Sequence, residues 1–100
     1  YTHGEAVALG MRAVFHLAAR RGSCAPELAA QVDRLYDEFG LPARIEGCTA
    51  DALLDKIGND KKVRAGRVNW VLPTLPGEVD IRDDVPLEDV RAVVVALGAA

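Results

Sequence analysis

The strongest constraint on the fold is a helix-start signal at the amino-terminal end of the chain. Thr2 and Glu5 have the spacing of a capping box, in which the threonine hydroxyl accepts a hydrogen bond from the N3 amide and the glutamate carboxylate accepts one from the threonine amide. The spacing predicts a helix that begins at His3 and continues to about Arg21. Most residues of this stretch are apolar, which is typical of a helix that is central to its domain and mostly buried.

The polar residues of this helix recur at helical spacing and form one narrow stripe: Glu5, Arg12, His16 and Arg20. Apolar side chains cover the rest of its surface: Val7, Leu9, Met11, Val14, Phe15 and Leu17. Gly4 and Gly10 each cost roughly 1 kcal/mol of helix propensity relative to alanine. We therefore interpret both glycines as places where backbone or a ligand comes close to the helix.

Two further helices are predicted in the middle of the chain. Pro26 suits the first position of a helix and Gly40 is a stop signal, so one helix is expected from Pro26 to Phe39. Thr49 is a good N-cap for a shorter helix that ends at about Gly58-Asn59. The apolar face of the longer helix, in which we interpret the two aromatic residues as core, comprises Leu28, Val32, Leu35, Tyr36 and Phe39.

The carboxy-terminal part of the chain predicts a hairpin and a fourth helix. One strand alternates through Val68, Trp70 and Leu72, the other through Val79 and Ile81, and a turn at 73–77 joins them. Since an isolated hairpin is only marginally stable, its apolar side, led by the tryptophan, is expected to lie on the helices. Pro86 opens the last helix and Gly98 ends it, and its predicted buried face comprises Leu87, Val90, Val93, Val94 and Leu97. The predicted fold class is mainly α: four helices with one small antiparallel β-hairpin between the third and fourth helices.

Length and composition exclude several classes of protein. One hundred residues, half of them apolar, are expected to form one domain. The net charge of -3 argues against a nucleic-acid-binding protein, and the first helix lacks the ~20-residue uncharged span that a bilayer requires. Nothing resembles a secretory signal, so we expect a soluble, cytoplasmic protein with no nucleic-acid or membrane partner. The lack of an initiator methionine leads us to expect a piece of a larger protein.

Cys24 and Cys48 do not have CxxC spacing, and each lies near a predicted loop. A reduced pair is favoured over a disulfide in the expected compartment, and no role is assigned to either thiol.

His3 is the candidate metal ligand. The positive end of the helix dipole disfavours its imidazolium form and keeps a lone pair available for a metal. The alternative is an ordinary first-turn histidine. Thirteen helical steps of about 100° place His16 near the opposite face, and Glu5 also points away, so no ligand set closes within this helix.

A local cluster of basic residues follows the third predicted helix. Five of the twelve lysines and arginines lie between Lys56 and Arg67, around the triplet Asp60-Lys61-Lys62. The cluster is either a solvated loop, as most charge runs are, or a site in which ammonium groups pair with a phosphate or carboxylate.

The run His3-Gly4-Glu5-Ala6-Val7-Ala8-Leu9-Gly10-Met11, followed by Asp60-Lys61-Lys62 and the hairpin, resembles the carboxy-terminal domain of the 3-dehydroquinate synthases, within the sugar-phosphate cyclase family. The resemblance covers essentially the whole chain. It implies that residues 1–100 are a zinc- and substrate-binding domain, with a missing amino-terminal NAD-binding α/β domain as its partner. Pro76 departs from the family, which commonly has an aliphatic residue before the turn glycine.

The resemblance also implies a chemistry. The parent enzyme, a lyase of the shikimate pathway to aromatic amino acids, converts 3-deoxy-D-arabino-heptulosonate 7-phosphate to 3-dehydroquinate and phosphate. Its cofactors are NAD and a divalent cation, zinc or cobalt. His3 would be one of three protein ligands to the metal, the other two lying upstream, and Lys61 would bind the substrate phosphate, in a register uncertain by one residue. The isolated fragment is expected to be inactive, and a homodimer stays open.

Two alternatives accompany this interpretation. Another sugar-phosphate cyclase, such as a 2-deoxy-scyllo-inosose synthase or a sedulose-type 7-phosphate cyclase, would share the metal and NAD chemistry. A non-enzymatic helical interaction module would instead use the basic loop to bind an acidic partner or RNA without a metal. The zinc content of the full-length protein would separate the enzymes from the module.

Overall fold

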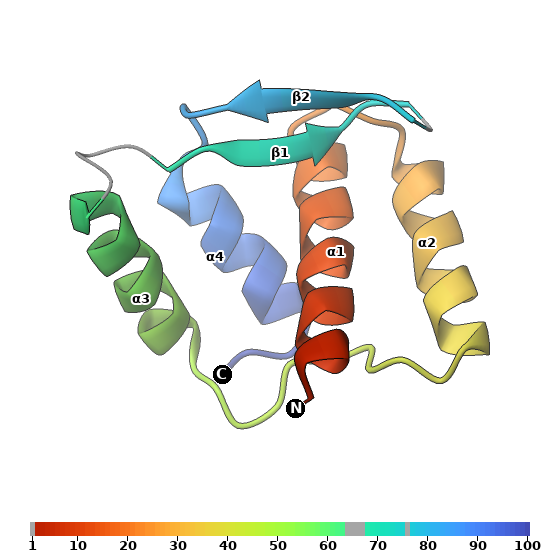
Figure 1. Cartoon of the computed structure of the whole chain (residues 1–100), viewed down its shortest axis with the longest axis horizontal. Coiled ribbons are helices and arrows are strands. Elements are labelled where there is room, and N and C mark those ends of the chain that lie inside the picture. The colour runs from red at the N-terminus through yellow and green to blue at the C-terminus, as the bar shows by residue number, and fades with distance from the viewer. Residues whose placement is uncertain (1, 64–67, 76) are drawn as a thin grey trace.

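The computed structural model describes residues 2–63, 68–75 and 77–100, and in the third helix it describes the side chains up to Asn59. The elements follow the order α1 (His3–Arg20), α2 (Pro26–Glu38), α3 (Ala50–Val63), β1 (Trp70–Pro73), β2 (Val79–Arg82) and α4 (Leu87–Ala96) (Figure 1). The predicted fold class is confirmed: four helices, with an antiparallel pair of strands between α3 and α4.

The helix starts are those that the side chains predict. The Glu5 amide donates to Thr2 Oγ1 at 3.2 Å and the Thr2 amide donates to Glu5 Oε1 at 2.9 Å, which completes the capping box of α1. The Ala52 amide donates to Thr49 Oγ1 at 3.1 Å at the start of α3. Pro26 occupies the first turn of α2, where its missing N–H costs nothing.

Glycines in the left-handed conformation end three of the described helices, Gly22 after α1 and, as predicted, Gly40 and Gly98 after α2 and α4. At the end of α2, Gly40 has φ 70°, and the Leu41 amide donates to the Tyr36 carbonyl at 3.0 Å in a Schellman motif. At the end of α4, Gly98 has φ 113°, and a Cβ added there would lie 2.9 Å from the carbonyl oxygen of Ile45. Gly98 therefore combines a left-handed backbone with a close approach to another segment of the chain.

The third helix is longer than predicted. It continues through Gly58 and Asn59 to Val63, so Asp60-Lys61-Lys62 extends the helix instead of following it as a loop. Gly58 is not among the glycines of positive φ, so it does not form a stop. A glycine inside a helix costs only about 1 kcal/mol relative to alanine, a cost that continued hydrogen bonding and packing can offset.

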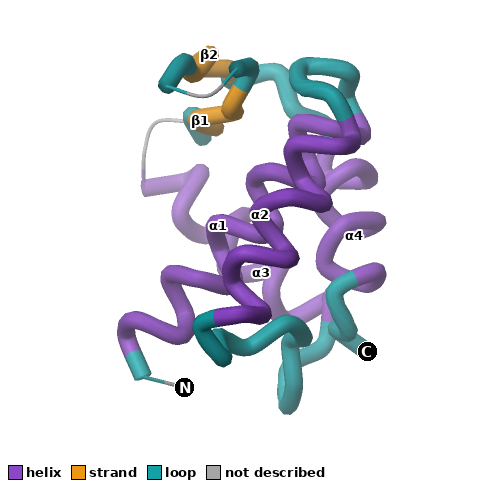
Figure 2. The backbone as a smooth tube through the Cα atoms, turned by 90° about the vertical axis from the view of Figure 1, so that its right-hand side faces the viewer, coloured by secondary structure: helices purple, strands orange, loops and turns teal. Residues whose placement is uncertain are grey.

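The helices stand side by side in a row, and the hairpin lies across the helix ends on one side of that row. α1 packs on α4, α2 packs on the outer side of α1, and α3 packs on α4 (Figure 1). The hairpin crosses above α1 through β1, as the view from the side also shows (Figure 2). The buried core therefore lies between α1, α3, α4 and β1, and its buried members include Leu17, Leu54, Leu72, Val90 and Val94.

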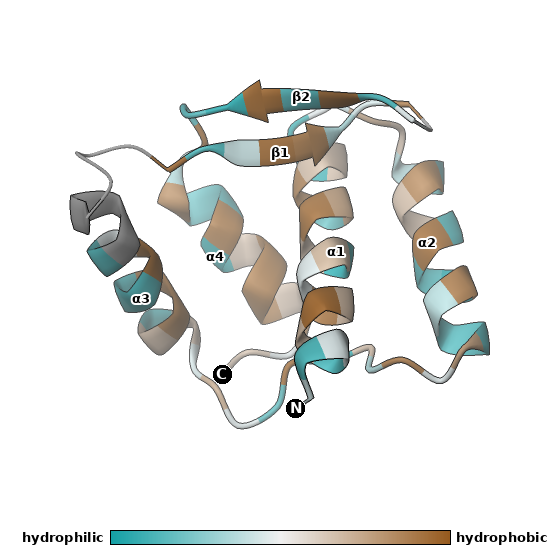
Figure 3. Ribbon diagram, in the orientation of Figure 1, coloured by the Kyte–Doolittle hydropathy of each residue, from teal (hydrophilic) through white to brown (hydrophobic). Residues whose placement is uncertain are grey.

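The apolar residues of β1 face the helices as predicted, but those of β2 do not. Leu72 is fully buried and Trp70 is partly buried against the core, opposite Asp80 and Arg82 respectively. Because directly paired residues share a face, Ile81, opposite Val71, points outward, and Val79 does the same. The expectation that the apolar residues of β2 lie on the helices is therefore wrong, and they alternate with polar residues on an exposed strand (Figure 3).

Several side chains are also more or less buried than the helical pattern predicts. Arg12, expected in the polar stripe, is only 2% exposed because α2 supplies its charge partners. Phe39, expected in the core, is 74% exposed because it is the C-cap residue beyond the last turn of α2. The predicted core residues that are exposed instead are Val7, Met11, Leu35 and Leu87. In the described part of the chain, every helix is too short or too polar to cross a bilayer.

Candidate functional site

The predicted metal ligand lies at the exposed start of α1. His3 is the first residue of the helix, and within the described residues it has no hydrogen-bond or ion-pair partner. The neighbouring Glu5 is already committed to the cap, and the hydrogen bond from the Thr2 amide lowers the pKa of its carboxyl group. His3 is exposed, and a Cβ added at the neighbouring Gly4 would have nothing within 4 Å.

The other histidine of α1 belongs to a different contact. His16 Nε2 lies 2.7 Å from Asp33 Oδ2 of α2. Thirteen residues of one helix correspond to about 20 Å of axial rise, so it cannot join His3 around one ion. Among the described residues, no three His, Cys, Asp or Glu side chains are grouped to hold a metal. The residues present therefore fit one ligand position and do not form a complete metal site.

The predicted phosphate ligand lies near the end of α3. Lys61 is in the helix by its backbone, but its side chain falls outside the described residues, as do Arg64 and Arg67. α1 begins on the side of the molecule away from the hairpin, whereas α3 ends on the hairpin side (Figure 1). The chain by itself thus places His3 and Lys61 on different helices, His3 at the side of the molecule far from the hairpin and Lys61 at the side near it.

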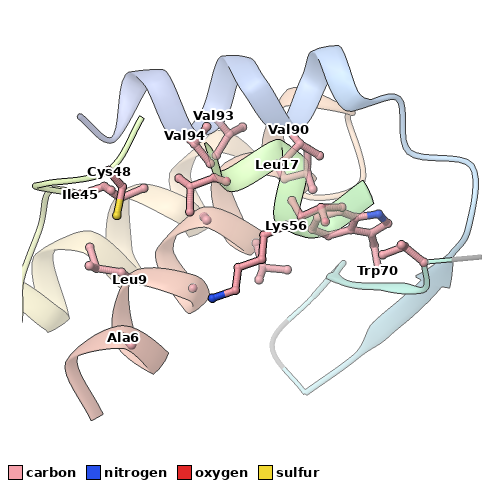
Figure 4. Close-up of a pocket in the computed structure, with 16 residues that line it drawn as sticks. Ala6, Leu9, Leu17, Ile45, Cys48, Lys56, Trp70, Val90, Val93 and Val94 are labelled. Carbon is pink, nitrogen blue, oxygen red and sulfur yellow. The ribbon is translucent and has the colours of Figure 1, made fainter. Parts of the chain in front are cut away.

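A large apolar groove separates these two helices, and sequence reasoning missed it. Its volume is about 630 Å³, and α1 and α3 form its walls while α4 forms its floor (Figure 4). Trp70 lies at one end and Cys48 at the other, and Lys56 extends from α3 across it. The signal that could have predicted it is the apolar surface of α1, which is too wide for one partner helix to cover.

The most buried charged side chain among those described, Arg12, joins two helices. Arg12 Nη1 donates to Asp33 Oδ1 at 3.1 Å and Nη2 donates to Asp37 Oδ1 at 2.9 Å. The same nitrogens donate to the carbonyl oxygens of Asp33 and Leu41, each at 3.3 Å, and the guanidinium lies 5.5 Å from the centroid of the Tyr36 ring. This network joins α1 to α2, and we call it the Arg12 network.

The two thiols differ in their surroundings, and both are free. Cys24 is buried in the core, and this burial raises the pKa of its thiol. Cys48 is exposed and lies in the loop before α3. Neither thiol belongs to a group of described residues that could hold a metal.

Comparison with known proteins shows which family the chain resembles. The profile described as 3-dehydroquinate synthase C-terminal matches residues 1–63, which include both His3 and Lys61. A 3-dehydroquinate synthase of Synechococcus sp. (strain CC9605) is 48% identical over 90 residues, which are 90% of this chain and 24% of that relative. The 3-dehydroquinate synthase of Nostoc punctiforme is 40% identical over 92 residues, 91% of this chain and 25% of the relative.

A more divergent relative gives the same result. The 3-dehydroquinate synthase of Rhizobium johnstonii is 36% identical over 93 residues, 88% of this chain and 25% of its own length. The chain thus spans about a quarter of the curated relatives it matches. These alignments extend beyond residue 63 and cover most of the chain. Because the family profile matches more than half of its residues, the chain belongs to the 3-dehydroquinate synthase C-terminal family.

Proposed function

We propose that the full-length protein is a 3-dehydroquinate synthase, which converts 3-deoxy-D-arabino-heptulosonate 7-phosphate to 3-dehydroquinate and inorganic phosphate. Residues 1–100 would be its carboxy-terminal zinc- and substrate-binding domain. The observation that carries the proposal is the family match over residues 1–63, which contains both candidate site residues. An amino-terminal domain of the same cytoplasmic protein would bind NAD.

His3 suits the role of one metal ligand. It is exposed in the first turn of a helix, so its side chain is accessible to a metal whose other ligands lie outside the described residues. A bound divalent cation, zinc or cobalt, would polarise hydroxyl and carbonyl oxygens of the substrate. The capping box fixes the first turn of α1, so the backbone that carries His3 is held in place before any ligand arrives.

Lys61 suits the role of a phosphate ligand. An ammonium group is a compact charge that pairs with phosphate oxygens, and its binding energy can orient a substrate whose reacting carbon lies elsewhere. The negative end of the helix dipole near the end of α3 disfavours an anion, so a bound phosphate there depends on lysine charge. The relatives are named as enzymes, which favours this role over that of an interaction surface.

The experiment uses the full-length protein, stripped of metal and then supplied with NAD and zinc or cobalt. We expect phosphate release from 3-deoxy-D-arabino-heptulosonate 7-phosphate that requires both additions. His3→Ala should purify metal-depleted and nearly inactive yet folded, since a three-ligand site that loses one ligand binds metal far more weakly. A variant that keeps its metal and activity would make His3 an ordinary first-turn histidine.

The second variant tests the phosphate. Lys61→Ala should lower kcat/KM and weaken the binding of phosphonate analogues, and it should hardly change the binding of a non-phosphorylated analogue. Lys62→Ala is the matched control and should do less. Equal losses for both kinds of analogue would assign Lys61 to the fold of the α3 terminus. Turnover of a different sugar phosphate in preference to the heptulosonate would point to another cyclase of the superfamily.

A further inference from the structure

The groove between α1 and α3 lacks a covering element. Among the described residues, no Cα atom of α1 lies within 8 Å of a Cα atom of α3, although both helices pack against α4. The wall on α1 consists of Ala6, Leu9, Gly10, Ala13, Val14 and Leu17. Three of these, Ala6, Gly10 and Ala13, are small and lie at helical spacing, so they leave a shallow surface that another helix can approach closely.

The lining favours an apolar segment of protein over a small molecule. Sites for small ligands carry a few convergent polar groups that fix the orientation of the ligand. Among the described residues Lys56 is the one charged side chain of the lining, and the other polar groups are the Cys48 thiol and the indole N–H of Trp70, which comes from the far end of the groove. Lys56 also has a long aliphatic stem, which can cover apolar surface while its ammonium group reaches water.

We propose that a helix of the same polypeptide, from the segment preceding Thr2 in the full-length protein, fills this groove and completes the hydrophobic core. The relatives are about four times as long as this chain, and the matching profile is the carboxy-terminal one, so they have most of their length on that side. Consecutive elements usually pack together, and α1 is the element that a preceding helix would meet first. The inference does not depend on the reaction proposed above.

The first test measures the reactivity of Cys48 in the native full-length protein. Cys48 is exposed here and lines the groove, whereas Cys24 is buried and lies outside it. Labelling with N-ethylmaleimide, followed by peptide mass spectrometry, should show Cys48 reacting at least about tenfold more slowly in native protein than in urea. A native rate equal to the unfolded rate would show an open groove and overturn the proposal.

The second test places a large side chain in the groove. A Cβ at Gly10 or at Gly58 has nothing within 4 Å in this structure, and Gly58 faces a separate depression between α3 and α4. If the groove is filled, Gly10→Leu should lower the melting temperature of the full-length protein by roughly 2–10 °C through overpacking. The control, Gly58→Leu, should not. A Gly10→Leu protein as stable as the control would contradict the proposal.

A cross-link identifies the occupant. Lys56→Cys, in a Cys48→Ser background, would carry a benzophenone maleimide at the mouth of the groove. Irradiation of the full-length protein should give an intramolecular cross-link to a peptide on the amino-terminal side of Thr2. Cross-linked dimers would assign the groove to a second copy of the chain, and the absence of any protein cross-link would indicate that no segment covers it; either result overturns the proposal.

Discussion

Among the described charged side chains, we expect the loss of Arg12 to lower the free energy of unfolding the most. Arg12 is 2% exposed and makes two ion pairs and two further hydrogen bonds to backbone carbonyl oxygens, all of them to α2 or the loop that follows it. Removing one member of a buried ion pair costs about 3–5 kcal/mol when the partner is left buried. Here the carboxylates of Asp33 and Asp37 are 29% and 59% exposed, so water can replace the lost arginine.

These exposures set the expected magnitude. Arg12→Ala should lower the free energy of unfolding by about 2–3 kcal/mol, below the value for a fully buried pair. Arg12→Met preserves the packing of the aliphatic stem and should cost about 1 kcal/mol less. Asp37→Asn, at the more exposed carboxylate, should cost less than about 1 kcal/mol.

Urea denaturation of the four proteins would provide the measurement, with equal m-values confirming that the unfolded states are comparable. A loss below about 1 kcal/mol for Arg12→Ala would show that α2 is held to α1 by apolar contacts alone. Equal losses for the alanine and methionine variants would contradict the separation of packing from charge.

Three further predictions follow from single positions. Gly98→Ala should lower the free energy of unfolding by about 1–3 kcal/mol, because the substitution adds a Cβ clash to a left-handed backbone. Gly22 is also left-handed but has open space around it, so Gly22→Ala should cost only about 1 kcal/mol, and thermal unfolding would compare the two variants. Trp70→Ala should cost about 2–3 kcal/mol in equilibrium unfolding, less than a fully buried tryptophan, because Trp70 is only partly buried. The hydrogen bonds and charge of Arg82 lower the pKa of Asp84 to about 2. The Asp84 carboxylate therefore stabilises the folded state above pH 3.8, and this stabilisation is lost as the pH falls through about 2. Arg82→Gln should return the NMR titration midpoint of Asp84 to the ordinary range.

The elements were predictable because their start and stop signals are local. The capping box of Thr2 and Glu5, the N-cap at Thr49 and the glycine at position 40 each act within a few residues, and the structure has all of them. Gly58 shows the limit of such signals. A glycine stops a helix only where it adopts the left-handed conformation, and sequence alone does not determine whether Gly58 does so.

The partners of the helices were less predictable, because they depend on tertiary contacts. Arg12 was expected in a polar stripe, but two carboxylates one turn apart on α2 draw it into the interface. Ile81 follows the expected alternation, yet the pairing register turns it outward. For the site, the sequence predicts His3 and Lys61 only as single residues, and the described part of the chain contains no group of side chains that would test their roles together.

The composition of α1 follows from the number of partners it requires. Arg12 and His16 face α2, and Leu17 and Ala18 belong to the core shared with α4 and β1. The groove-lining positions of α1 lie on average roughly 100° around the helix from Arg12 and His16, so they face away from α2. Leu17 belongs to both the core and the groove lining, so the groove continues the core at its open edge. A helix with one solvent-facing side needs apolar residues on only part of its surface, whereas one that is apolar almost all round needs partners on nearly every side. α2 covers one side of α1, and α4 and β1 together cover a second. The groove is the third side, which no described element covers.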